Sequence, residues 1–113
     1  MSLPIIVLDD AENELEVAVT SYEEKAPGLG ADFRAEIDRA FGLVSALPRA
    51  GKRVAGTRAG EVRQVFVKRF PFGVVYLLEP AVIWVVAVAH HRRLPGIGRA
   101  DFVEPRLPLD VGR

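Results

Sequence analysis

The sequence contains no cysteine, one methionine, one tryptophan and two histidines among its 113 residues. The lack of cysteine excludes disulfides, thiolate metal sites and cysteine nucleophiles, and it fits a reducing compartment. The longest apolar run, residues 81–89, is far too short to span a bilayer. The first ten residues lack the charged region and long apolar stretch of a signal peptide, so we expect a cytoplasmic protein without membrane attachment.

The composition favours one globular domain. Half of the residues are hydrophobic, which argues against disorder over most of the chain. A chain of this length can form a single hydrophobic core, and no internal repeat or change in composition indicates a second domain. We predict one domain over residues 1–113, in which residues 99–113 form an irregular tail because they show no periodicity.

Charge is distributed unevenly, although the net charge is zero. Residues 1–48 contain three Lys or Arg and ten Asp or Glu, whereas residues 49–99 contain ten Lys or Arg and two Asp or Glu. Such asymmetry indicates an anionic partner for the basic half. Two halves that attract each other would show the same pattern, so both explanations stay open at this point.

Three apolar runs, residues 61–70, 72–78 and 82–90, follow one another with short breaks. Strands this close together are expected to pair antiparallel, because a parallel crossover needs a dozen or more residues. The run Pro4–Leu8 predicts one further strand, and residues 48–60 are predicted to form a basic, Gly-rich loop.

Residues 9–47 predict two helices, because apolar residues recur there every three or four positions. The first stripe is Ala11, Leu15, Ala18, Tyr22 and Ala26, and the second is Phe33, Ile37, Ala40 with Phe41, Val44 and Leu47. Asp9 or Asp10 is expected to cap the first helix, Pro27-Gly28 to end it, and the second helix to run from about residue 30 to 47. We therefore predict an α+β fold in the order strand-helix-helix-strand-strand-strand, with a helical hairpin on one face of a mainly antiparallel sheet.

Few side chains are suited to catalysis or to cofactor binding. No serine lies in a nucleophile-elbow context, and Gly28-Leu29-Gly30 follows a helix rather than a strand, so a Ser-His-Asp site and a dinucleotide site are both unsupported. Adjacent His90 and His91 on a strand would point to opposite faces and would chelate one ion poorly. We expect no metal and no cofactor.

Basic residues at the ends of the predicted strands are the strongest functional signal. The set comprises Arg49, Lys52, Arg53, Arg58, Arg63, Lys68, Arg69, Arg92, Arg93 and Arg99. Guanidinium and ammonium groups in such positions suit phosphates or the carboxylates of an acidic protein partner. Trp84 is expected in the core, and the Tyr76 hydroxyl needs a hydrogen-bond partner or water.

Three segments resemble the RelE/ParE superfamily of toxins from bacterial type II toxin–antitoxin systems, which includes plasmid stabilization proteins. They are YEEKAPGLGADFRAEIDRA, VRQVFVKRFPFGVVY and VVAVAHHRRLPG, and the likeness covers residues 4–98. The resemblance implies the fold predicted above and a cognate antitoxin that binds the toxin as a hetero-oligomer. It also implies growth inhibition, through DNA gyrase for ParE-like members or through mRNA cleavage on the ribosome for RelE-like members.

The resemblance implies two sets of site residues. A partner or target would be bound by Arg63, Arg69, Tyr76, Arg92 and Arg93. A metal-independent endoribonuclease needs a base, an acid and cations for the phosphorane, and Lys68, Arg69, His91 and Arg92 are the candidate cations.

The nuclease set is incomplete when compared with RelE-like enzymes. Those enzymes resemble one another in an arginine three residues before the tyrosine that matches Tyr76, and Gly73 stands there in this chain. Their C-terminal tyrosine should follow the His-His-Arg-Arg run, and residues 95–98 contain none. The sequence therefore favours a ParE-like protein that is not a nuclease, with a RelE-like nuclease and a non-toxic antitoxin-binding relic as alternatives.

Overall fold

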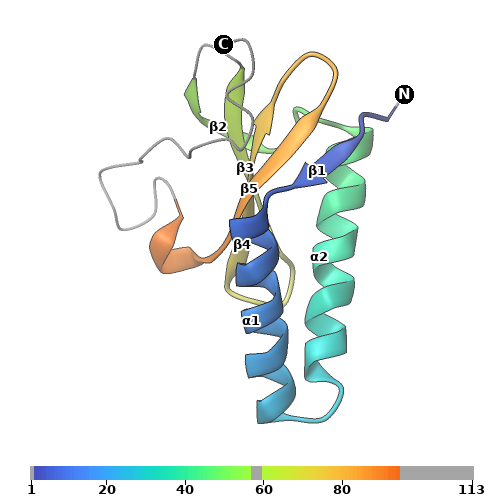
Figure 1. Ribbon diagram of the computed structural model, residues 1–113, viewed down its shortest axis with the longest axis vertical. Coiled ribbons are helices and arrows are strands. Elements are labelled where there is room, and N and C mark those ends of the chain that lie inside the picture. Colours follow the sequence, from blue (N-terminus) through green and yellow to red (C-terminus); the bar gives the residue numbers. More distant parts are fainter. Residues whose placement is uncertain (1, 57–59, 95–113) are drawn as a thin grey trace.

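A helical hairpin and a five-stranded sheet form the two layers of the computed structural model, which describes residues 2–56 and 60–94. The two helices lie side by side and antiparallel, and the sheet is inclined behind and above them (Figure 1). The chain enters at β1 beside the end of the second helix, so residues from both ends of the described chain meet in one part of the sheet. Within the described residues, no helix has the length and apolar character needed to cross a membrane.

The helices α1 (Asp9–Lys25) and α2 (Leu29–Ala46) bury the predicted stripes. Ala11, Leu15 and Ala18 of α1 are buried, as are the α2 residues from Phe33 to Val44 at helical spacing. Leu47 is an exception, because it follows the helix and 59% of it is exposed.

The connection between the helices is short because Gly28 adopts a left-handed conformation with φ of 87°. The Glu23 carboxylate accepts hydrogen bonds from the amides of Gly28 (2.9 Å) and Gly30 (3.0 Å). A side chain of α1 thus satisfies free donors at the N-terminus of α2, which fixes the hairpin.

The sheet has the strand order β1-β5-β4-β3-β2. The strands are β1 (Ile5–Val7), β2 (Lys52–Gly56), β3 (Glu61–Phe66), β4 (Phe72–Leu78) and β5 (Ile83–His90). The pairs β2–β3, β3–β4 and β4–β5 are antiparallel, and β1 pairs with β5 in parallel. The predicted architecture is confirmed, with one more strand than expected.

Three local predictions were wrong. Residues 48–60 contain β2, an edge strand whose register shifts between Arg53 and Ala55, so its sequence does not alternate. The first helix has Leu8 at its N-cap without a side-chain hydrogen bond, and Asp9 and Asp10 lie in the first turn, where negative charge favours the helix dipole. The strand predicted over residues 61–70 is β3, and it ends at Phe66.

Each face of the sheet has its own apolar core. The helices cover the face that carries Val65, Val74, Tyr76 and Val85. The opposite face carries a second cluster with Trp84, 8% of which is exposed, so the expected core position of Trp84 is confirmed. Both faces of β4 and β5 are therefore buried, which explains why these strands are apolar at nearly every position.

Candidate functional site

The β3–β4 turn and the 3₁₀ turn η1 (His91–Arg93) meet at one end of the sheet, which we call the cationic end. The amide of His91 donates to the carbonyl of Pro71 at 2.9 Å, and the rings of Phe66 and His91 make an edge contact at 5.1 Å. Lys68, Arg69, His91, Arg92 and Arg93 therefore come from two segments that are distant in sequence and adjacent in space.

Arg69 projects from the β3–β4 turn toward α2. Its guanidinium lies 3.6 Å from the Asp32 carboxylate and 3.8 Å from that of Glu36, and it stacks over the Phe70 ring. Arg69 has a left-handed φ of 72°, which is costly for a residue with a Cβ. Arg69 was predicted to lie within a strand over residues 61–70, and this was wrong because it lies in the turn after β3.

Arg93 projects toward α1, where its guanidinium lies 3.9 Å from the Glu14 carboxylate. Glu14 also accepts a 2.9 Å hydrogen bond from the Val88 amide on β5, beyond the last residue that pairs with β1. Arg69 and Arg93 thus join the basic sheet to the acidic helices. Attraction within the molecule accounts for part of the charge asymmetry in the sequence.

Lys68 and Arg92 are different, because both side chains are exposed and neither forms an ion pair with any described residue. The ring of Phe66, 52% of which is exposed, contacts the ring of His91, the residue that precedes Arg92. Two unpaired cations at an end of the sheet that also carries an exposed aromatic ring can bind carboxylates or phosphates of another macromolecule. They are the candidate contact residues of the cationic end.

Arg63 lies elsewhere, on β3, and only 15% of its side chain is exposed. Its guanidinium donates to Glu61 at 2.7 Å and to the carbonyl of Gly51 at 2.6 Å. The hydrogen bond from Arg63 is the main cause that lowers the pKa of Glu61 below its ordinary value. Arg63 therefore holds the segment between α2 and β2 against the sheet, and its charge is already neutralised.

Tyr76 faces Arg63 across the β3–β4 ladder and is fully buried. Its hydroxyl donates to the Pro48 carbonyl at 2.7 Å and accepts from the Gly51 amide at 3.0 Å. Burial raises the pKa of Tyr76 above its ordinary value, so the hydroxyl stays neutral. Tyr76 has no exposed surface for a direct contact with a partner, which corrects the expectation from the sequence.

The residues expected for a nuclease lie at the same end of the sheet, but they do not form a set of free groups. Arg69 is paired with carboxylates of α2, and His91 packs edge-on against Phe66. A Cβ at Gly73, where RelE-like enzymes have an arginine, would lie 2.7 Å from a methyl carbon of Leu94. No group of three metal-binding side chains occurs in the described part of the chain.

Sequence inspection missed the roles of Glu14 and Glu61. Glu61 could have been found, because it lies two residues before Arg63 and therefore on the same face of a strand. Glu14 gave no such signal, since its partner Val88 is 74 residues away.

Comparisons with known proteins agree with this geometry. Residues 5–95 match a family model described as the ParE toxin of the type II toxin–antitoxin system parDE. A solved structure, described as the chromosomal ParDE TA system from P. aeruginosa, is similar in fold with a TM-score of 0.66 and 13% sequence identity. The match covers 79% of this chain and 96% of that chain. The comparison with curated proteins gave no match.

Proposed function

Since the chain belongs to the ParE toxin family of type II toxin–antitoxin systems, we propose that it inhibits growth and is neutralised by a cognate antitoxin. The antitoxin would be encoded by a short open reading frame next to this gene, and the two proteins would form a hetero-oligomer in the cytoplasm. A ParE-like, non-enzymatic action on DNA gyrase is the form of inhibition that we favour.

The observation that carries this proposal is the pair of free cations, Lys68 and Arg92, at the cationic end. Both are exposed and form no ion pair with a described residue, so they can bind an anionic macromolecule without breaking such a pair. Charged groups at the rim of an interface raise the association rate and select partners of complementary charge.

Metal-independent RNA cleavage is the second candidate, and the structure offers it less support. Such cleavage needs free groups for proton transfer and for stabilising the phosphorane. Of the four residues expected for it, Arg69 is ion-paired to α2, and only Lys68 and Arg92 are both exposed and unpaired among the described residues.

The first experiment is induction of this chain without the adjacent reading frame, followed by growth, DNA supercoiling and mRNA 5′-end measurements. We expect growth arrest, filamentation and loss of gyrase supercoiling with intact mRNA. New 5′ ends inside translated codons would establish the nuclease instead. Normal growth together with antitoxin binding would identify a non-toxic relic.

Two double variants connect the activity to the cationic end. Lys68→Ala with Arg92→Ala removes the free cations, whereas Lys25→Ala with Arg34→Ala removes one lysine and one arginine from the helices. We expect the first to lose growth inhibition and the second to keep it. Equal toxicity of the two would show that the cationic end does not bind the target.

A further inference from the structure

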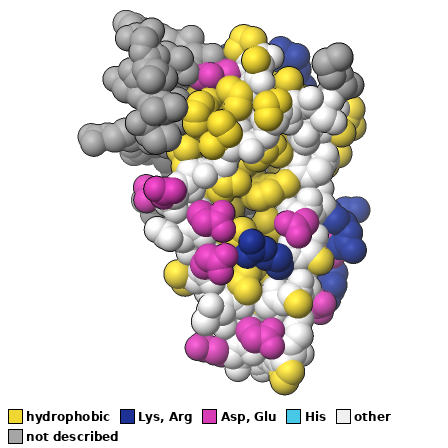
Figure 2. Space-filling model, turned by 45° about the vertical axis from the view of Figure 1, so that its right-hand side comes forward, with side chains coloured by type: hydrophobic (Ala, Val, Ile, Leu, Met, Phe, Trp, Pro, Cys, Tyr) yellow, Lys and Arg dark blue, Asp and Glu magenta, His cyan; other side chains and the backbone are white. Residues whose placement is uncertain are grey.

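An open apolar cavity of about 740 Å³ lies where α2 ends and the N-terminal segment enters β1. In Figure 2 hydrophobic side chains gather in the upper part of the face shown, and acidic side chains, with some Lys and Arg side chains among them, occupy the part below. The apolar lining residues include Leu3, Ala46, Leu47, Pro48, Leu78 and Pro80. A cavity of this size and lining suits a bound apolar group.

The wall between α2 and β2 is held in place before any partner binds. The Tyr76 hydroxyl donates to the Pro48 carbonyl and accepts from the Gly51 amide, and Arg63 donates to the Gly51 carbonyl. Two residues of the sheet thus hold this segment by hydrogen bonds. A Cβ at Gly51 would lie 2.5 Å from the Tyr76 hydroxyl oxygen, which shows how closely the segment lies on the sheet. A preformed wall lowers the entropy cost of binding.

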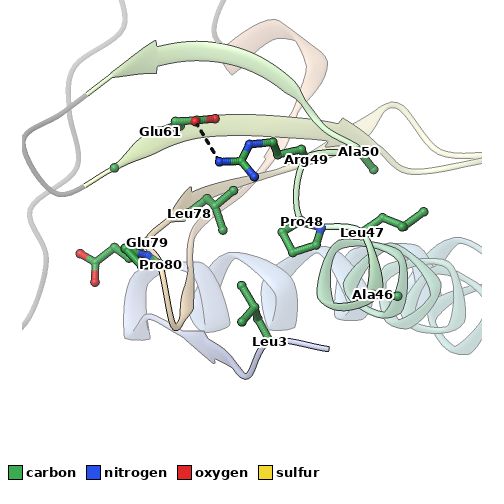
Figure 3. Close-up of a pocket in the computed structure, with 11 residues that line it drawn as sticks. Leu3, Ala46, Leu47, Pro48, Arg49, Ala50, Glu61, Leu78, Glu79 and Pro80 are labelled. Carbon is green, nitrogen blue, oxygen red and sulfur yellow. Dashed lines mark ion pairs between the residues drawn. The ribbon is translucent and has the colours of Figure 1, made fainter. Parts of the chain in front are cut away.

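One cation is available at the mouth of the cavity. Arg49 is 73% exposed and reaches Glu61 only at 3.7 Å, whereas Arg63 already binds Glu61 at 2.7 Å. In Figure 3 the guanidinium of Arg49 extends along one side of the cavity, while the carboxylate of Glu79 points away from its centre. The exposed residues Lys52 and Arg53 follow on the edge strand β2.

Apolar lining with an exposed arginine at its edge selects an acidic, amphipathic partner segment. We propose that this cavity anchors an apolar side chain of the antitoxin, while a neighbouring carboxylate of the antitoxin binds Arg49. The anchor is separate from the cationic end, which remains the contact for the growth target. This inference rests on the proposed function, because the occupant is the antitoxin.

Affinity measurements with matched variants test the anchor. The probe is the purified product of the adjacent reading frame, titrated by calorimetry against the full chain. Leu47→Asp places a charge at the cavity and should raise Kd about 30-fold, as loss of a central interface residue does. Arg49→Gln should raise Kd about tenfold, as expected when a cation in a charge-assisted contact is lost.

Each variant has a control of the same kind on the helices. Val17→Asp also adds a charge at an exposed apolar residue, 70% accessible, and Arg34→Gln also removes an exposed arginine that is paired with a glutamate. Both controls should change Kd by less than about twofold, as surface residues outside an interface do. Circular dichroism would verify that all four variants fold.

Hydrogen exchange gives a second measurement that needs no variant. Binding of the antitoxin should slow exchange in peptides that contain residues 46–50 and 78–80 more than in peptides from residues 16–24. If both cavity variants bind the antitoxin with the affinity of the parent, and exchange slows only in other peptides, the proposed anchor site is wrong. The antitoxin would still be established as a partner. Absence of any binding would overturn both proposals.

Two other occupants predict different results. If a second copy of this chain fills the cavity, Leu47→Asp will change the sedimentation of the free protein and not the antitoxin affinity. If the chain covers the cavity itself, residues 46–50 will be protected before the antitoxin is added and will not change afterwards. Either result would overturn the anchor.

Discussion

The hydroxyl of Tyr76 donates a 2.7 Å hydrogen bond to the carbonyl of Pro48, and this bond joins the middle of β4 to the end of α2. The same oxygen accepts from the Gly51 amide, so one buried side chain satisfies both a donor and an acceptor of the segment that follows the helix. A phenylalanine ring could fill the same space in the core, but only a tyrosine hydroxyl can form both hydrogen bonds to the segment that follows α2.

Tyr76→Phe is therefore expected to destabilise the protein by about 1–3 kcal/mol, because the Pro48 carbonyl and the Gly51 amide lose their partner inside the structure. Tyr22→Phe is the control, since Tyr22 is partly buried in the helical core with its ring against Phe33 and Phe70. It should change the free energy of unfolding by less than about 0.5 kcal/mol. Urea unfolding of the three proteins measures both values.

Alkaline pH should weaken the folded state through the tyrosines. Burial raises the pKa of Tyr76 and of Tyr22 above the ordinary value of 10.0. The unfolded chain therefore loses these protons first, and the stability from the neutral hydroxyls, complete below about pH 10, falls as pH rises through the folded-state pKa. Urea unfolding between pH 8 and 11 should show the advantage of the parent over Tyr76→Phe decreasing with pH. A constant difference would contradict the assignment.

Acid pH should act through Glu61. The hydrogen bond from Arg63 holds the pKa of Glu61 below its ordinary value of 4.5. Stability from this pair is present above about pH 4.5, where the unfolded chain is also ionised, and it is lost as pH falls through the folded-state pKa. Glu61→Gln should therefore show a smaller loss of stability between pH 5 and 3 than the parent. If the free energy of unfolding of the two proteins falls equally between pH 5 and 3, the Glu61–Arg63 pair does not contribute the expected stability.

The positive φ of Arg69 predicts an unusual order of stability. Arg69→Ala loses the ion pairs with Asp32 and Glu36 and keeps the left-handed strain, whereas Arg69→Gly loses the same pairs and removes the strain. The glycine variant should therefore be more stable than the alanine variant by about 1 kcal/mol. Chemical unfolding measures the free energy of unfolding of both variants. An alanine variant that is at least as stable as the glycine variant would contradict backbone strain at this position.

The sequence predicted those elements whose periodicity is regular. Helical spacing from Ala11 to Val44 was enough for the hairpin, because both helices bury one continuous stripe. The strand β2 shows no regular alternation of apolar and polar residues, because a bulge shifts its register. It also lies at the edge of the sheet, where its basic residues are exposed. The β3 boundary was misplaced because Val67 and Phe70 are buried in a turn rather than in a strand.

The candidate site was less predictable for a physical reason. Basic residues are visible in a sequence, but whether each is free depends on carboxylates that the fold brings to it. Arg69 meets Glu36 and Arg93 meets Glu14 only after the helices dock on the sheet, and Lys68 and Arg92 form no ion pair with any residue of 2–56 or 60–94. Tyr76 was expected to bind a partner or target, and its register on a central strand buries it.

The pairing of β1 with β5 sets an order for biosynthesis. Ile5 pairs with Ile83, so the first strand to leave the ribosome must wait for the last strand before it can join the sheet. Loop closure over such a separation is slow compared with formation of the helical hairpin. A nascent or prematurely terminated chain that lacks β5 therefore has no completed sheet, and the growth inhibition proposed above should be confined to chains translated past His90.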